Sequence, residues 1–335
     1  MGVIVRSFAK INLGLCIGAR RADGFHELRT IYQTVALHDL IRVEVVRGRG
    51  IEILCEDSRV PRDETNTCWR VAELVMAGLR ARGRVLILID KRLPVRGGLG
   101  AASGNAVAVL LGLERAVGKQ LSSASKLEIA ASVGSDLPLF LIGGTVLGVG
   151  RGEEVYPAPD LPEVVCVVAT PDIGVSTPKA FRDWDSFTGR AEQMRTSAST
   201  RVSLTATTSS DRINEFGRRV SGWLSSDLSG VPGSSGRGRA GNPLLDLVRT
   251  GIENDFEQVV FPKYPELREV KRVLEKTGAY YASLSGSGSA LYGLFRSQAA
   301  AKKAVAQLGK IGTSSVITKT LGRQQYWKKW LVREF

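Results

Sequence analysis

The chain has 335 residues, 43% of them hydrophobic, and a net charge of +13 at neutral pH. This length allows two domains with a generous core. Because it holds no apolar run of membrane-spanning length and no signal-peptide pattern, we expect a cytoplasmic protein without a membrane partner. Four scattered cysteines and only two histidines argue against a disulfide framework and a histidine-based metal site.

Strands dominate the first ninety residues. Alternation predicts a strand over residues 3–17, with Lys10 and Asn12 on one face, followed by a charged turn at 18–24. Lys10 is either a strand-edge side chain that reaches water, which spacing alone favours, or a buried cation that needs an anionic partner. Further elements are predicted in this order: strands at 30–37, 40–47 and 51–55, a helix at 66–82 and a strand at 85–90.

A glycine-rich run at residues 93–106 separates the last of these strands from an apolar helix at 106–113. Backbone N–H groups and the positive end of a helix converge in such a turn, and small side chains let a ligand reach the backbone. The run lacks the Lys-Ser/Thr pair of a P-loop and the third glycine of the dinucleotide fingerprint. By itself it is equally a phosphate-binding loop or a tight strand–helix connection.

A helix is predicted to end at Val133, and Asp136 follows it in a turn before an apolar run. Pro138 predicts the end of any helix at this point. Asp136 is either a proton acceptor for a substrate hydroxyl or, as its position alone favours, an N-cap or turn residue. Glycines between 143 and 152 then predict a β-hairpin.

The second half of the chain contains a segment of unusual composition. Prolines within 157–162 mark the predicted domain boundary, and a strand begins at 164–169. Residues 189–242 are rich in Ser, Thr, Gly and Arg, and we expect a mobile insertion, peripheral to the chemistry, with a short helix from Ser209 through Trp223. A helix at 265–276 and a strand at 280–284 precede a second glycine–serine loop at 283–290, which either holds a ligand between two domains or is a hairpin turn.

Basic residues concentrate at the end of the chain. Residues 299–335 carry eight Lys or Arg and a single Glu, with one tyrosine and two tryptophans near the end. Such a segment either contacts nucleic acid or acidic lipid, or forms a final strand and helix whose aromatic rings pack on the protein. We favour the second interpretation and expect no nucleic-acid partner. The sequence leaves monomer and homodimer open.

Three short motifs occur in order along the chain. They are Ala-Lys-Ile-Asn-Leu at 9–13, Pro-x-x-x-Gly-Leu-Gly at 94–100 and Ser-Gly-Ser-Gly at 285–288. This order resembles the motifs of the GHMP small-molecule kinases, the group of galactokinase, homoserine kinase and mevalonate kinase. Longer segments at 18–28, 134–140, 143–153, 175–181 and 254–257 are similar to those of the 4-diphosphocytidyl-2-C-methyl-D-erythritol kinase family. The resemblance covers about 1–185 and 250–296.

The resemblance implies an α+β protein with the two-domain GHMP kinase fold. Residues 1–157 would form an N-terminal ATP-binding domain like domain 2 of ribosomal protein S5, and residues 158–335 a ferredoxin-like α/β sandwich. The implied activity transfers a phosphoryl group from ATP, with Mg2+, to the 2-hydroxyl of 4-diphosphocytidyl-2-C-methyl-D-erythritol. That compound is a small-molecule substrate of the non-mevalonate isoprenoid pathway.

The resemblance also implies roles for individual residues. Asp136 would be the base near the acceptor hydroxyl, with Lys10 beside it offsetting charge on the transferred phosphoryl group. The ATP phosphates would lie on a loop made of Pro94, Gly97, Gly98, Leu99, Gly100, Ala101, Ala102, Ser103 and Gly104. The substrate would be held by Asn12, Phe25, His26, Phe181, Gly286 and Ser287. Here His26 would bond the cytosine edge, Phe25 and Phe181 would sandwich the ring, and the 286–289 loop would close over the diphosphate.

The glycine loop departs from the family's usual Gly-Leu-Gly-Gly-Gly-Ser-Ser-Asp-Ala. Ala101 and Ala102 replace glycines, Gly104 replaces a serine and Asn105 replaces an aspartate. Alanine disfavours positive φ, which a helix start does not need. Because Asn105 has no carboxylate, the metal ligands are unknown. The Ser103 hydroxyl is the one candidate ligand.

Two other functions stay open at this point. One is a GHMP kinase for another small alcohol, such as homoserine or mevalonate, in which a base-reading His26 would serve no purpose. The other is a non-catalytic relative that binds nucleotide or RNA, against which the presence of both Lys10 and Asp136 argues.

Overall fold

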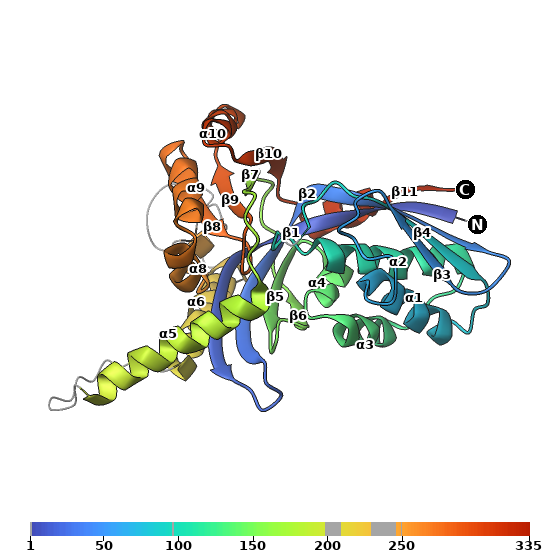
Figure 1. The fold of residues 1–335 in the computed structure, drawn as a ribbon, viewed down its shortest axis with the longest axis horizontal. Helices are drawn as coiled ribbons and strands as arrows, with labels where there is room; N and C mark the ends of the chain where they lie inside the picture. Colours follow the sequence, from blue (N-terminus) through green and yellow to red (C-terminus); the bar gives the residue numbers. More distant parts are fainter. Residues whose placement is uncertain (1, 96, 198–208, 229–245, 249) are drawn as a thin grey trace.

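The computed structural model describes residues 2–95, 97–197, 209–228, 246–248 and 250–335. A seven-stranded sheet occupies one half of the molecule and a four-stranded sheet the other (Figure 1). Helices pack against both sheets, and the predicted α+β class is confirmed. No helix in these described ranges is long and apolar enough to cross a membrane.

The larger sheet is built on a long antiparallel hairpin of β1 (Gly2–Arg20) and β2 (His26–Val46). Its order is β11-β1-β2-β4-β3, with β5 paired to β2 and β6 paired to β5. The separate strands expected at 30–37 and 40–47 are one strand. The register steps from the Phe8–His38 pair to the Ala9–Val35 pair, so residues 36 and 37 form a bulge within β2 rather than a break. The other members are β3 (Ile51–Cys55), β4 (Arg84–Asp90), β5 (Thr145–Val149), β6 (Glu154–Pro157) and β11 (Leu331–Glu334).

Four helices pack with the larger sheet. They are α1 (Thr67–Gly78), α2 (Ala101–Val117), α3 (Ser123–Val133) and α4 (Leu137–Ile142). Most of α2 is buried between α1 and the strands β1 and β2, because its residues from 104 to 113 are small or apolar apart from Asn105. The expectation that Pro138 ends a helix was wrong. Pro138 lies in the first turn of α4, where a missing N–H removes no helical hydrogen bond.

The smaller sheet has the order β10-β7-β9-β8 and is antiparallel throughout. Its strands are β7 (Val165–Thr170), β8 (Tyr281–Leu284), β9 (Leu291–Phe295) and β10 (Ser314–Lys319). The helices α8 (Glu257–Lys263), α9 (Pro265–Lys276) and α10 (Gln298–Lys310) belong to this half (Figure 1). The two glycine-rich runs of the sequence thus lie in different halves of the molecule.

Two further helices contain much of the segment at 189–242. α5 (Thr177–Ser197) projects from the body (Figure 1), and α6 (Ser209–Leu228) packs along β1. The predicted helix at 209–223 is confirmed, and this helix also contributes to the hydrophobic core. Its apolar side chains join the core beside β1, namely Ile213, Phe216, Val220 and Trp223. The remainder of the expected insertion, 198–208 and 229–245, lies outside the described residues.

The basic C-terminal segment packs on the protein as expected. In α11 (Arg323–Trp330), Tyr326 and Trp330 are buried, and the Tyr326 hydroxyl donates to the Phe140 carbonyl at 2.8 Å. β11 then pairs with β1 next to the start of the chain, so the two termini lie side by side (Figure 1). The last strand therefore completes the sheet that the first half of the chain builds.

Candidate active site

Lys10 is a buried cation. It lies in the middle of β1 with 3% of its surface exposed, so the strand-edge interpretation was wrong. Its Nζ lies 2.6 Å from the Asn12 Oδ1, to which it donates, and 3.3 Å from the Asp136 Oδ2. The Asn12 amide in turn donates to the Thr30 hydroxyl at 2.8 Å. These contacts satisfy a charge that would otherwise be costly to bury.

Asp136 stands where α4 begins, but its side chain makes no capping hydrogen bond. Its carboxylate instead turns towards Lys10 and also accepts a hydrogen bond from the Tyr32 hydroxyl at 3.0 Å. Burial and the neighbouring carboxylate raise the pKa of Tyr32 well above its usual value, so the hydroxyl remains a donor. One third of the Asp136 side chain is exposed, which leaves it accessible to a ligand.

The glycine-rich run turns directly into α2. Gly98 and Gly100 have positive φ angles of 72° and 68°, and Gly100 caps the helix without any side-chain hydrogen bond. Ala101 and Ala102 lie inside the helix, as a helix start allows. The N–H groups of the first turn, unsatisfied by a side chain, and the positive end of the helix dipole form an anion site.

The second glycine loop packs on the first. The Ser285 hydroxyl donates to the Gly98 carbonyl at 2.9 Å, and the Ala290 N–H donates to the Gly97 carbonyl at 3.2 Å. A side chain at Gly98 would place its Cβ 2.1 Å from the Ser285 carbonyl oxygen. The buried Asn254 donates to the carbonyls of Leu284 and Gly286, both at 2.8 Å, and so fixes the second loop. The loop is the expected hairpin turn, because it joins the antiparallel strands β8 and β9, and it also packs on the first glycine loop.

Two pockets meet at these loops. One, of about 370 Å³, is lined by residues 97–103 of the glycine run together with Pro94 and Asn105. Gly104 does not line it but packs on β1, where a Cβ would lie 2.8 Å from the Ser7 hydroxyl. The other pocket, of about 600 Å³, contains Lys10 and Asp136, and the two pockets share Gly98 and Ser103.

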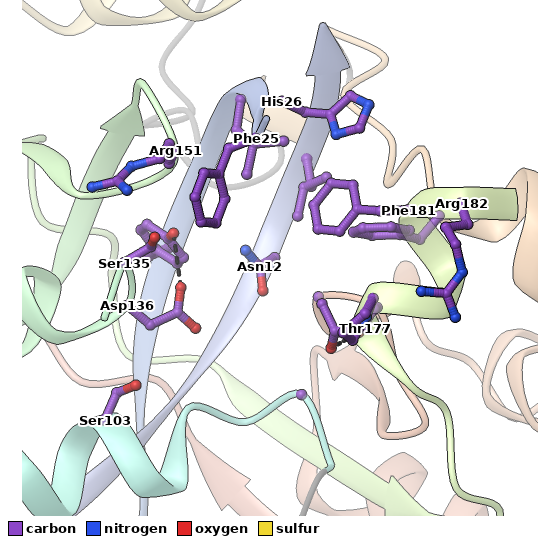
Figure 2. Close-up of a pocket in the computed structure, with 18 of the residues that line it drawn as sticks. Asn12, Phe25, His26, Ser103, Ser135, Asp136, Arg151, Thr177, Phe181 and Arg182 are labelled. Atoms are coloured by element: carbon purple, nitrogen blue, oxygen red, sulfur yellow. Dashed lines mark hydrogen bonds between the residues drawn. The ribbon is translucent and has the colours of Figure 1, made fainter. Parts of the chain in front are cut away.

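The larger pocket brings together all six residues expected to hold the substrate. They are Asn12, Phe25, His26, Phe181, Gly286 and Ser287. Figure 2 shows Phe25 and Phe181 on opposite sides of the cavity, with Asn12 between them and Asp136 and Ser103 lower in the view. The Phe25 ring is half exposed and lies 5.0 Å from the Arg151 guanidinium, while the Phe181 ring is stacked on the imidazole of His26.

Several polar residues of this pocket were missed from the sequence. Tyr32 lies on the strand next to Asn12, and nothing in its neighbouring sequence distinguishes it from an ordinary core tyrosine. Thr177 hydrogen-bonds Ser287 at 2.7 Å, and Asp185 hydrogen-bonds His26. Both come from α5, the helix that also carries Phe181. Arg20, Arg151 and Arg182 also line the pocket and supply positive charge.

Asp39 is a fully buried carboxylate next to the smaller pocket. It accepts hydrogen bonds from the N–H groups of Arg92 and Leu93, both at 2.7 Å, and from the Lys91 ammonium at 2.8 Å. The Asn105 amide donates to it at 3.0 Å from within α2. Asp39 thereby joins the segment before the glycine loop to the helix after it. Asn105 is part of this contact and faces a carboxylate, so a second carboxylate at 105 would be repelled.

No group of three or more His, Cys, Asp or Glu residues that could hold a metal ion occurs in the described ranges. Ser103 lines both pockets and Asp136 lines the larger one, so both bring side-chain oxygen atoms to the site. A site with few protein oxygens suits Mg2+ that is bound mainly through substrate phosphates.

Comparison with known proteins agrees with this geometry. The family model described as GHMP kinases N terminal domain matches residues 66–144, and the one described as GHMP kinases C terminal matches residues 242–313. The 4-diphosphocytidyl-2-C-methyl-D-erythritol kinase of Solibacter usitatus is 36% identical over 97% of this chain and 91% of that protein. The protein of that name from Acaryochloris marina is 33% identical over 90% of this chain and 89% of its own length.

Solved structures agree as well. A crystal structure of 4-(cytidine 5'-diphospho)-2C-methyl-D-erythritol kinase covers 96% of this chain and 100% of its own, with 28% identity and a TM-score of 0.67. A homoserine kinase from Cytophaga hutchinsonii, 20% identical with a TM-score of 0.66 over 97% of this chain and 96% of its own, has the same fold. The predicted two-domain GHMP kinase fold is thereby confirmed. The chain belongs to the GHMP kinases and, within them, to the 4-diphosphocytidyl-2-C-methyl-D-erythritol kinase family.

Proposed function

We propose that the protein transfers the γ-phosphoryl group of ATP to the 2-hydroxyl of 4-diphosphocytidyl-2-C-methyl-D-erythritol. The observation that carries this proposal is the meeting of the two pockets at Gly98 and Ser103, beside Lys10 and Asp136. An acceptor alcohol in the larger pocket and a phosphate chain in the smaller one would face each other at that junction. Phosphoryl transfer depends chiefly on such alignment and on charge stabilisation.

Asp136 and Lys10 act on the acceptor side. The acceptor oxygen attacks the γ-phosphorus, its proton passes to the Asp136 carboxylate, and ADP leaves. Tyr32 donates to one Asp136 oxygen, which leaves the other facing Lys10 and the cavity. The Lys10 ammonium, held by Asn12, offsets the negative charge that gathers on the transferred group.

The glycine loop binds the phosphate chain of ATP. The free N–H groups at the start of α2 and the helix dipole favour anions, and Gly98 and Gly100 leave no side chain in the way. Mg2+, when bound, would neutralise the phosphate oxygens, and the Ser103 hydroxyl is the residue placed to contact it. Asp39 accepts hydrogen bonds from the Lys91 ammonium and the Arg92 N–H, and so holds the segment that leads into the loop in position.

The far end of the larger pocket takes the cytidine. Phe25 and Phe181 offer aromatic faces from opposite sides, and His26 offers a ring nitrogen to the edge of the base. The loop at Gly286 and Ser287 lies between this subsite and Lys10, where the diphosphate would pass. A homoserine or mevalonate kinase has no use for such a base subsite, which favours the cytidine substrate.

A coupled assay of ADP release tests the proposal. The purified protein with ATP, Mg2+ and the cytidine substrate is expected to turn over, while Asp136→Asn and Lys10→Ala lose at least about a thousandfold in kcat, as expected for groups at the reacting atoms. Glu52→Gln, which alters an ion pair on the sheet surface, is the matched control and keeps full activity. Equal turnover of a substrate without the cytidine, or of homoserine or mevalonate, would contradict the proposal.

A further inference from the structure

Asp185 is a carboxylate of the larger pocket that has no role in the transfer itself. It lies on α5, two turns from the start of the helix, with 43% of its side chain exposed. Its Oδ1 lies 2.7 Å from the Nε2 of His26, whose side chain is only 7% exposed. This contact joins α5 to the start of β2 across one wall of the pocket.

The contact determines which nitrogen of His26 carries hydrogen. An ionised carboxylate can only accept a hydrogen bond, so Nε2 must donate and therefore carries a proton. In the neutral ring Nδ1 then has a free lone pair and is an acceptor. In the described part of the chain, no residue hydrogen-bonds this Nδ1, and the ring lines the cavity.

The plane of the imidazole is fixed as well. The Phe181 ring lies parallel to it, with an interplanar angle of 11° and 5.0 Å between the ring centres. Phe181 and Asp185 are four residues apart on α5 and so lie on the same face of the helix. One face of α5 thus sets the plane of the imidazole by stacking, and it sets which ring nitrogen carries the proton by hydrogen bonding.

We propose that Asp185 is a positioning residue that holds His26 with its proton on Nε2, so that Nδ1 accepts a hydrogen bond from an exocyclic amine of the bound base. Cytosine carries such an amine, whereas uracil carries a carbonyl oxygen at that place, which would face the Nδ1 lone pair. The contact therefore selects cytidine over uridine. This inference rests on the proposed function for its choice of base.

Nuclear magnetic resonance tests the proton position without any assay of activity. The chain has only two histidines, and His38 provides an internal reference, because its Nδ1 donates to the Ala36 carbonyl at 2.8 Å. Long-range proton–nitrogen spectra of the ¹⁵N-labelled protein at pH 8.5 are expected to show opposite tautomers, with hydrogen on Nε2 in His26 and on Nδ1 in His38. The spectrum of His38→Gln assigns the two signals. A proton on Nδ1 of His26 would overturn the inference.

Kinetics test the consequence for specificity. Asp185→Ala is expected to raise KM for the cytidine substrate about tenfold with little change in kcat. It should also lower the ratio of kcat/KM between the cytidine substrate and its uridine counterpart about tenfold. Asp185→Asn should restore most of the preference, because its amide oxygen can still accept from Nε2.

Asp183→Ala is the matched control. It removes the same charge from the same helix, but Asp183 pairs with Lys263 and does not line the larger pocket. Its cytidine preference is expected to equal that of the wild type. An unchanged preference in Asp185→Ala would refute the inference even if the cytidine substrate is phosphorylated. If the wild type turned over neither substrate, the proposed function and the base preference would both fail, and the tautomer measurement would still decide whether Asp185 sets the proton.

Discussion

At the scale of single residues, the site depends on polar groups buried in the hairpin of β1 and β2. Lys10, Asn12 and Tyr32 come from β1 and β2, and each is buried with a polar partner. The sequence predicted Lys10 and Asn12 through the family motif but not Tyr32. A tyrosine in an apolar strand is common in cores, so only the position of Asp136 opposite its hydroxyl gives it a role.

Tyr32→Phe should lower kcat about fivefold. The change removes the hydrogen bond to Asp136, worth about 1 kcal/mol, while water can reach the exposed part of the carboxylate and replace it. Steady-state rates with the cytidine substrate and ATP measure the effect. Tyr156→Phe, at an exposed position on β6, is the control and should not change kcat. A Tyr32→Phe enzyme as fast as the wild type would show that this hydroxyl does not position Asp136.

The four cysteines should be unreactive in the native protein. All four are buried. Burial raises the pKa of Cys16 and of Cys68 to about 12, with the nearby Asp255 adding to the effect at Cys16, and burial also raises the pKa of Cys166. Iodoacetamide at pH 8 should therefore label no cysteine in the folded protein and all four in guanidinium, as counted by mass spectrometry. Because the folded pKa values of Cys16, Cys68 and Cys166 lie above those of the unfolded chain, these three thiols stabilise the fold fully below about pH 8.5 and lose this contribution as the pH rises towards 12. Native labelling at pH 8 would contradict the assigned burial.

At the scale of elements, the proposed active site lies at the contact between two loops that follow strands of different sheets. The glycine run continues into α2, and the second loop connects β8 to β9. Helical periodicity and the glycines predicted both loops. Their mutual contact could not be predicted, because it depends on hydrogen bonds between Ser285 and Gly98 and between Ala290 and Gly97, which are nearly two hundred residues apart.

A position can require glycine because its φ is positive or because a side chain would collide with a neighbour. The variants Gly98→Ala and Gly118→Ala separate these two reasons. Both positions have positive φ, 72° and 68°, so alanine should cost each about 1 kcal/mol of unfolding free energy. Only at Gly98 would the added Cβ also meet a backbone atom, the Ser285 carbonyl oxygen, whereas nothing lies within 4 Å at Gly118. Denaturant unfolding should show a larger loss for Gly98→Ala, and ATP turnover should fall only in that variant. Equal losses of stability and full activity in both would contradict the loop contact.

At the scale of the whole molecule, the positive charge favours an anionic substrate. The net charge is +13, and Arg20, Arg151 and Arg182 line the larger pocket while Arg59 and Lys91 line the smaller one. Such a field raises the rate of encounter with polyanions and is screened by salt, with a Debye length of about 8 Å at physiological ionic strength.

Raising the ionic strength should therefore lower kcat/KM for the cytidine substrate and leave kcat nearly constant. We expect a severalfold decrease between 20 mM and 500 mM potassium chloride at saturating ATP, measured by initial rates. Potassium acetate serves as the control for a specific effect of chloride. A kcat/KM that does not depend on salt would show that the positive charge does not act on substrate encounter.

The sequence by itself determined the fold class, the family, the order of most elements and the residues of the two glycine loops. These features follow from local periodicity, turn chemistry and long motifs, all of which are written in neighbouring residues. Only the tertiary structure decided that Lys10 is buried, that β2 continues through a bulge and that α5 brings Asp185 to His26. Each of these outcomes depends on contacts between residues far apart in the chain, which local propensity does not encode. At Lys10 and at His26, pairing with a distant carboxylate lowers the free energy of a buried polar group.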